Sequence, residues 1–214
     1  MLQELREAVC ALHLELPRNG LVSWTSGNIS ARDPDTGLVV IKPSGVRYHQ
    51  LTPDALCVLD VQGRQVEGTL RPSADTATHL FVYRQRADVH GIVHTHSPYA
   101  TAWACSGKPL PVYLTSMADV FGQPVPCAPY IQIGTEAIGA AIVRWIGRSP
   151  ALLLKNHGVF TIGETAEKAL QAAIMLEDAA RIVSIARALG PIDELAPEEV
   201  ERQHRYYLEQ YGQH

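Results

Sequence analysis

The apolar positions of the chain follow helical spacing in some segments and strand spacing in others. Leucine and valine recur every three or four residues from Leu2 to Leu16, which predicts a helix that ends near Pro17. Short runs rich in apolar or β-branched residues predict strands, and these are residues 21–24, 38–41, 57–60, 65–67, 91–96, 110–114, 151–155 and 159–162.

Capping and turn residues bracket further segments of helical length. The predicted helices are residues 73–86, 98–105, 136–146, 165–189 and a last one that begins at 197. Turns are expected at residues 26–28, 33–37 and 43–45. Because the strands are joined mainly by tight turns, and because no repeat or linker interrupts the chain, we expect one α/β domain over residues 1–214 with a mostly antiparallel or mixed sheet.

Composition narrows the class of protein. Of the 214 residues, 46% are hydrophobic and 19% are charged, which is typical of a globular protein rather than a disordered one. A net charge of −4 excludes a generic basic surface for nucleic acid, although a few local donors can still hold a small anionic substrate. No apolar run approaches the roughly 18 residues of a membrane span, and the N-terminus is charged where a signal peptide is apolar. The expected location is cytoplasmic.

The cysteines fit that location. Cys10, Cys57, Cys105 and Cys127 are far apart in sequence and form no CxxC pair. We therefore expect four reduced thiols rather than disulfides.

Two histidines have the spacing of metal ligands. His94 and His96 fall in a predicted strand, where residues two apart point to the same face. They form a natural pair of zinc ligands, or else two hydrogen-bonded polar residues on a half-exposed strand. His157 is the best third ligand, since it follows an apolar strand and precedes Gly158. By contrast, surface or satisfied core positions are expected for His13, His49, His90 and His214.

Three small turns are rich in hydrogen-bond donors. They contain Gly27-Asn28, Lys42-Pro-Ser44-Gly45 and Arg71-Pro-Ser73. Backbone N–H groups, hydroxyls and one lysine can cradle a phosphate, although each turn can also simply close a hairpin. None of them matches the P-loop or the dinucleotide-binding fingerprint.

Six motifs in fixed order give the chain a resemblance that covers nearly its whole length. They are Thr25-Ser-Gly-Asn28-Ile-Ser, Val40-Ile-Lys42-Pro-Ser-Gly-Val46, Val66-Glu-Gly68, Arg71-Pro-Ser-Ala-Asp75-Thr, Gly91-Ile-Val-His94-Thr-His96-Ser and Asn156-His157-Gly158. Together they resemble the class II aldolase/adducin family, which implies a single domain with a central, mostly antiparallel sheet between layers of helices.

Within that family the chain is most similar to the L-ribulose-5-phosphate 4-epimerases. These carry Asp in the serine-rich motif, as at Asp75, where the related aldolases carry a catalytic Glu. They also have an acid/base Asp in an Ala-Asp-x-Phe-like segment, matched by Asp119, and a catalytic tyrosine in a terminal Tyr-Gly-Gln, matched by Tyr211. The implied activity is the interconversion of L-ribulose 5-phosphate and D-xylulose 5-phosphate by retro-aldol cleavage of C3–C4 and re-addition, as in arabinose degradation.

The resemblance also implies a set of site residues. A zinc ion, with Mn²⁺ or Co²⁺ as alternatives, is expected on Asp75, His94, His96 and His157. The predicted catalytic pair is Asp119 and Tyr211. The expected phosphate-binding residues are Gly27, Asn28, Lys42, Ser44, Gly45, Ser73 and Ala74. In the family the site lies between subunits of a fourfold homotetramer, and the C-terminal tyrosine comes from a neighbour.

The chain departs from the familiar epimerases at three places. Ala74 stands where they carry a second phosphate-loop serine, and the segments 132–150 and before Tyr211 are shorter. The alternatives are therefore an aldolase that resembles L-fuculose-1-phosphate aldolase, a sugar-phosphate dehydratase, or an adducin-like scaffold without chemistry. The intact histidines disfavour the scaffold.

Overall fold

The structure, a computed structural model, describes residues 2–133 and 135–212. Its centre is an eight-stranded sheet in the order β4-β3-β2-β1-β5-β8-β7-β6. The strands are β1 (Asn28–Arg32), β2 (Val39–Ile41), β3 (Cys57–Leu59), β4 (Gln65–Glu67), β5 (Gly91–Thr95), β6 (Cys127–Ala128), β7 (Ala151–Leu154) and β8 (Gly158–Gly163). Every neighbouring pair is antiparallel except β6 and β7.

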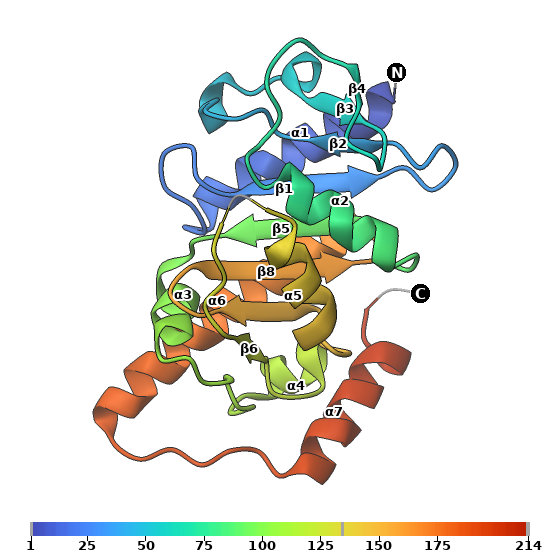
Figure 1. The fold of residues 1–214 in the computed structure, drawn as a ribbon. Helices are drawn as coiled ribbons and strands as arrows, with labels where there is room; N and C mark the ends of the chain where they lie inside the picture. Colours follow the sequence, from blue (N-terminus) through green and yellow to red (C-terminus); the bar gives the residue numbers. More distant parts are fainter. Residues whose placement is uncertain (1, 134, 213–214) are drawn as a thin grey trace.

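Helices cover both faces of this sheet. They are α1 (Gln3–Arg18), α2 (Thr76–Gln85), α3 (Pro98–Cys105), α4 (Thr115–Phe121), α5 (Ala137–Trp145), α6 (Ala166–Leu189) and α7 (Pro197–Gln210), with short 3₁₀ turns η1 (Tyr48–Gln50) and η2 (Pro53–Ala55). In Figure 1, α2 and α5 lie in front of the sheet and α1 and α6 lie behind it. The predicted α/β architecture with a mostly antiparallel sheet between helices is confirmed.

Each helical layer buries its own apolar cluster. On one face, α2 and α5 pack Val82 and Ile142 against Ile92 and Phe160 of the sheet. On the other face, α1 and α6 enclose a cluster that includes Leu16 and Ile29. The central strands β5 and β8 are therefore buried from both sides, which explains their nearly continuous apolar sequences.

Most predicted elements are confirmed, but two predicted strands are wrong. Residues 21–24 form no strand: the N–H of Leu21 bonds to Leu16 at the end of α1, and Trp24 adopts a left-handed backbone with φ 58°. The segment 110–114 makes a single bridge, from Leu110 to Val125. Apolar residues in both segments face the core from irregular backbone, so burial rather than strand pairing accounts for the pattern.

Two strands and one α-helix were not predicted, and neither were the 3₁₀ turns η1 and η2. Strand β1 begins at Asn28, the last residue of the turn predicted at 26–28. Strand β6 has two residues and α4 has seven, both too short for a periodic pattern. All four cysteines are free thiols, as expected. Across residues 2–133 and 135–212, no helix combines the length and apolar character that a bilayer crossing requires.

Candidate active site

Three histidines meet at one end of the central strands. The ring nitrogens of His94, His96 and His157 that face one another all lie within 4.8 Å. His94 stands near the end of β5, His96 just beyond it, and His157 in the turn between β7 and β8. Because β5 and β8 are paired antiparallel, the end of one strand lies beside the start of the other.

Local backbone geometry brings His157 into the cluster. Asn156 adopts a left-handed conformation with φ 58°, so the chain reverses within three residues between β7 and β8. Gly158 then passes close to the other two histidines: a Cβ there would lie 2.5 Å from the Thr95 carbonyl oxygen and 2.8 Å from Cδ2 of His96. Glycine at 158 thus allows the three imidazoles to approach one another.

Hydrogen bonds fix the tautomer of His94. Its Nδ1 donates to the carbonyl oxygen of Val159 over 2.8 Å, which leaves Nε2 as a lone-pair donor. Nε2 of His96 lies 3.0 Å from that atom. Two nitrogens on one tetrahedral ion at metal distances of about 2.0–2.1 Å stand about 3.3 Å apart, so this separation suits a shared ion.

Burial keeps the imidazoles neutral. It lowers the pKa of His94 to about 3, and it lowers the pKa of His96 and of His157 as well. Neutral imidazole is the form that binds metal ions. Nδ1 of His157 is buried and has no hydrogen-bond partner among the described residues, which is the condition of an atom that awaits a ligand or water.

Asp75 is the carboxylate next to this cluster. It precedes the first residue of α2, and its Oδ2 accepts a 2.7 Å hydrogen bond from Nδ2 of Asn28. Burial works to raise the pKa of Asp75, but His94, His79 and the Asn28 hydrogen bond outweigh it and hold that pKa below its ordinary value. The three neutral imidazoles fit Zn²⁺, and also Mn²⁺ or Co²⁺. Asp75 lies on the same cavity, but its carboxylate is not part of the group of ligand atoms that lie within 4.8 Å of one another.

A cavity of about 380 Å³ joins this cluster to the three predicted phosphate turns. Its lining residues are Thr25, Ser26, Gly27, Asn28, Lys42, Pro43, Ser44, Gly45, Ser73, Ala74, Asp75, His94, His96, Ile133 and His157. The structure thus gathers on one cavity all eleven residues that the sequence predicts for metal and phosphate binding.

Lys42 is the unusual member of this lining. It is only 2% exposed, and its Nζ donates to the backbone oxygens of Thr25 and Pro43 over 3.3 and 3.4 Å. Burial lowers its pKa. Among the described residues no carboxylate lies within ion-pair distance of this amine. A buried cation without a counterion favours an anionic ligand in the cavity.

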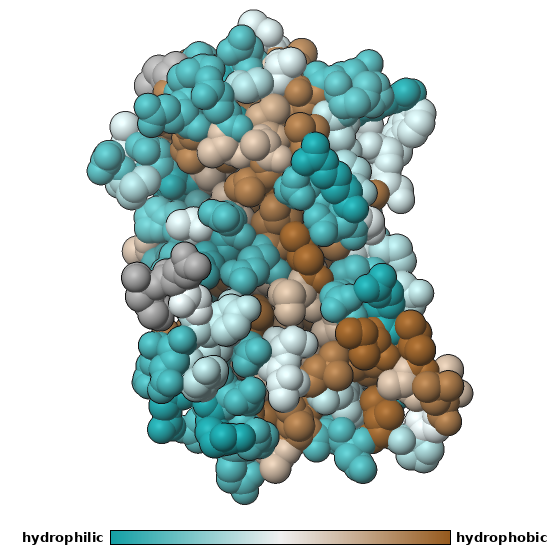
Figure 2. All heavy atoms as spheres, turned by 180° about the vertical axis from the view of Figure 1, so that it is seen from behind, coloured by the Kyte–Doolittle hydropathy of each residue, from teal (hydrophilic) through white to brown (hydrophobic). Residues whose placement is uncertain are grey.

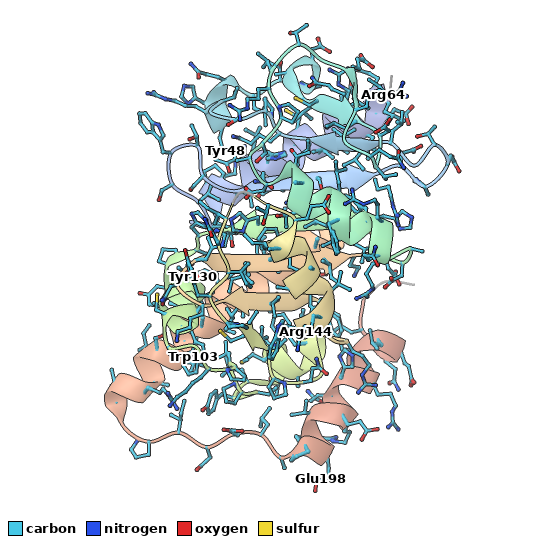
Figure 3. All side chains as sticks on the ribbon, viewed as in Figure 1. Tyr48, Arg64, Trp103, Tyr130, Arg144 and Glu198 are labelled. Carbon is cyan, nitrogen blue, oxygen red and sulfur yellow. The ribbon has the colours of Figure 1, made fainter. Side chains whose placement is uncertain are left out.

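Backbone hydrogen bonds tie the turns into one frame. Ser44 N donates to the Arg71 oxygen over 2.9 Å, and Ser73 N donates to the Lys42 oxygen over 3.0 Å. The side chain of Tyr48, labelled in Figure 3, supports the turn that contains Gly27 and Asn28. Its hydroxyl donates to the carbonyl oxygen of Ser26 over 2.7 Å. The donors of the cavity are therefore held in place before any ligand binds.

The predicted catalytic pair lies elsewhere. Neither Asp119 nor Tyr211 is among the described residues that line the cavity. Asp119 is half-buried on α4, where burial raises its pKa against the opposing effect of His204. Tyr211 is 65% exposed and stacks on Tyr207 just beyond α7. Figure 1 shows that the end of α7 and the end of β5 lie on opposite sides of the molecule.

Two further histidines were missed by the sequence reasoning. His79 lies one turn after Asp75 on α2, and its Nδ1 bonds to Ser30 Oγ over 2.7 Å. Its spacing of four from Asp75 was the available signal, because that spacing puts both residues on one helix face. His204 on α7 donates Nδ1–H to the Asp119 carbonyl oxygen, and nothing local in the sequence indicates that contact.

Comparison with known proteins defines the class. The chain matches the Class II Aldolase and Adducin N-terminal domain over residues 7–184, and it belongs to this family. It is 40% identical over 210 residues to the L-ribulose-5-phosphate 4-epimerase UlaF of Salmonella paratyphi B, covering 90% of this chain and 91% of that one. The corresponding protein of Salmonella paratyphi A is 40% identical over 203 residues, with 89% and 88% covered.

Solved structures with the same fold include two aldolases. An L-fuculose 1-phosphate aldolase superposes with a TM-score of 0.90 at 29% identity, covering 96% of each chain. The L-fuculose-1-phosphate aldolase of Thermus thermophilus superposes with a TM-score of 0.77 at 28% identity, covering 88% of this chain and 98% of that one.

Proposed function

We propose that this chain is a metal-dependent L-ribulose-5-phosphate 4-epimerase, which interconverts L-ribulose 5-phosphate and D-xylulose 5-phosphate. The observation that carries the proposal is the cavity that joins a neutral histidine cluster to a buried lysine with no carboxylate partner among the described residues. The 40% identity to relatives of that name selects the reaction within the family.

The substrate dictates how the reaction runs. The C4–H bond of the ketose is not acidic, so simple proton abstraction does not invert C4. A base instead removes the proton of the C4 hydroxyl, the C3–C4 bond breaks, and its electron pair moves toward the C2 carbonyl. The products are an enediolate and glycolaldehyde phosphate. When C3 adds to the other face of the aldehyde, the new C4 alkoxide takes up a proton and the epimer is complete.

The residues around the cavity divide these tasks. Asp75, His94, His96 and His157 would hold a divalent cation, which would supply Lewis-acid chemistry for the cleavage. Lys42 and the turns that bear Gly27, Asn28, Ser44, Gly45, Ser73 and Ala74 hold the phosphate. These phosphate contacts retain the aldehyde while it rotates to present its other face to C3.

Asp119 and Tyr211 are proposed as the two proton-transfer residues. They serve opposite faces of the aldehyde, because the C4 hydroxyl points in opposite directions in the two sugars. Tyr211 does not line the cavity of its own chain, and the end of α7 and the end of β5 lie on opposite sides in Figure 1, so we assign Tyr211 to the cavity of a neighbouring subunit in a fourfold homotetramer.

An exposed apolar surface supports association between copies. Ile182, Ile185 and Leu189 on α6 are 39%, 54% and 87% exposed. Figure 2 shows apolar side chains gathered at the lower right, over the C-terminal end of α6.

We further propose that residues 1–214 act as one domain, that the enzyme is cytoplasmic, and that it serves arabinose degradation.

The decisive experiment follows both products. The metal-loaded protein is incubated with L-ribulose 5-phosphate, and D-xylulose 5-phosphate and free glycolaldehyde phosphate are measured separately. Formation of the second pentulose without free aldehyde is the expected result. Absence of turnover in protein that demonstrably contains metal would overturn the proposal.

The aldolase alternative keeps one specific observation in its favour. An L-fuculose 1-phosphate aldolase shares this backbone fold with a TM-score of 0.90 at 29% identity. Release of free aldehyde from a ketose 1-phosphate, with no exchange of pentulose phosphates, would favour this alternative.

A further inference from the structure

One carboxylate occupies an otherwise apolar helix face. The buried residues of α6 are alanine, leucine and valine except for Glu177, which is 8% exposed. Burying a carboxylate among apolar side chains is costly unless its oxygens are hydrogen-bonded. Both oxygens of Glu177 are satisfied, and their partners lie on α3 rather than on its own helix.

Glu177 caps the N-terminus of α3. Its Oε1 accepts from Tyr99 N over 2.9 Å and its Oε2 accepts from Ala100 N over 2.8 Å. The residue in the capping position, Ser97, makes no side-chain capping bond. Pro98 has no N–H, and Thr101 N bonds to the Ser97 oxygen. The distant carboxylate therefore performs the capping that the local sequence does not supply.

The capped turn directly follows the histidine pair. His94 lies within β5, where strand pairing fixes its backbone, but His96 comes after Thr95, the last residue of that strand. The backbone beyond His96 leads within two residues into α3. The position of His96 therefore depends on how firmly the start of α3 is held.

Charge adds a second effect. The N-terminus of a helix carries a partial positive charge of about half a unit, which repels a nearby cation. A carboxylate on the first N–H groups of α3 opposes that charge next to the place where the cation binds. Glu177 thus favours metal binding through both geometry and electrostatics.

We propose that Glu177 is a positioning residue for the metal site, acting through α3 on His96. The inference rests on the proposed metal site. Glu177→Gln keeps the size of the side chain but removes its charge and one acceptor. Glu167→Gln, an exposed change on the same helix, is the matched control.

The test measures Co²⁺ binding to metal-free protein, by competition with a chelating dye and by the visible absorption spectrum of the bound ion. We expect Glu177→Gln to bind Co²⁺ about 10- to 100-fold more weakly with an altered spectrum. Glu167→Gln should match the wild type. A purely structural capping role would lower the melting temperature of Glu177→Gln and leave Co²⁺ affinity and spectrum unchanged, and that result would overturn the inference.

Two controls separate the possible failures. If the wild type binds no Co²⁺, the proposed metal site itself is wrong. If Glu177→Gln does not fold, Glu177→Asp keeps the charge with a shorter reach and should show a smaller loss of Co²⁺ affinity. Unchanged affinity in Glu177→Asp would then count against the role of Glu177.

Discussion

His204 on α7 donates an Nδ1–H hydrogen bond of 2.7 Å to the backbone oxygen of Asp119 on α4. The same imidazole covers Gly122, where an added Cβ would lie 2.6 Å from its Cδ2 atom. The helix that leads to Tyr211 is therefore held against the helix that carries Asp119. One side chain thus links the two elements to which we assign proton transfer.

Replacing Gly122 with alanine should loosen this contact. Gly122 and Gly147 have nearly equal backbone angles, φ +61° and +59°, but nothing lies within 4 Å of a Cβ at Gly147. Gly147→Ala should cost about 1–2 kcal/mol for the left-handed backbone alone. Gly122→Ala should cost a further ~1–3 kcal/mol because the imidazole must move. Urea unfolding measures both, and equal losses would argue against tight packing of His204.

Asp119→Asn should lower epimerase turnover about 10²- to 10⁴-fold, because the amide cannot take up and return the proton of the C4 hydroxyl. The Asp119 carboxylate has no hydrogen-bond or ion-pair partner among the described residues, so the fold should tolerate this change. Asp193→Asn, at an exposed position, serves as the control for charge. The measurement is turnover with saturating L-ribulose 5-phosphate. If Asp119→Asn is fully active, Asp119 has no role in the mechanism.

Tyr211→Phe tests whether subunits share a site. We expect Tyr211→Phe and His94→Ala to be inactive alone, since one lacks the hydroxyl and the other a metal ligand. If Tyr211 serves a neighbour in a closed ring, random mixing of the two variants restores about a quarter of the sites. Assays of refolded mixtures measure this fraction. No recovery in mixed oligomers would place Tyr211 in its own chain's site or outside catalysis.

Lys42→Gln should weaken substrate binding. Loss of a charge-assisted contact to phosphate is worth about 1.5–3 kcal/mol, so KM should rise about 10- to 100-fold. Lys168→Gln removes an exposed amine and should leave KM unchanged. Inhibition by inorganic phosphate should weaken in parallel. An unchanged KM in Lys42→Gln would mean that this amine does not contact the phosphate.

Stability of the metal-free protein should fall in acid. Burial lowers the pKa of His13 to about 3 and that of His79 to about 4, below the ordinary value of 6.5. Between those values the unfolded chain binds protons that the folded chain does not, so stability falls as pH drops below 6.5 and is level above it. Each histidine contributes up to about 1.4 kcal/mol per pH unit. Urea unfolding at several pH values measures the slope.

The sequence predicted local chemistry better than spatial relations between distant elements. The i, i+2 spacing of His94 and His96 predicts their common face because strand periodicity is local. The contact of His204 with α4 spans 85 positions and leaves no periodic trace. Residues 21–24 show the opposite error: an apolar run suggested a strand, but its leucine packs against α1 and its tryptophan turns outward. The need for burial explains why a position is apolar, but it does not determine the backbone conformation at that position.

The distribution of the proposed site over the fold also determines which function is lost first when the protein begins to unfold. The histidine cluster and Lys42 stand on or beside inner strands, whereas Asp119 and Tyr211 stand on α4 and at the end of α7. Peripheral helices open at lower free energy than central strands. Mild denaturation should therefore detach the proton-transfer residues while phosphate binding persists. Since cleavage of C3–C4 needs a base for the C4 hydroxyl, the enzyme would still bind its substrate but no longer convert it, so loss of catalysis would precede loss of substrate binding.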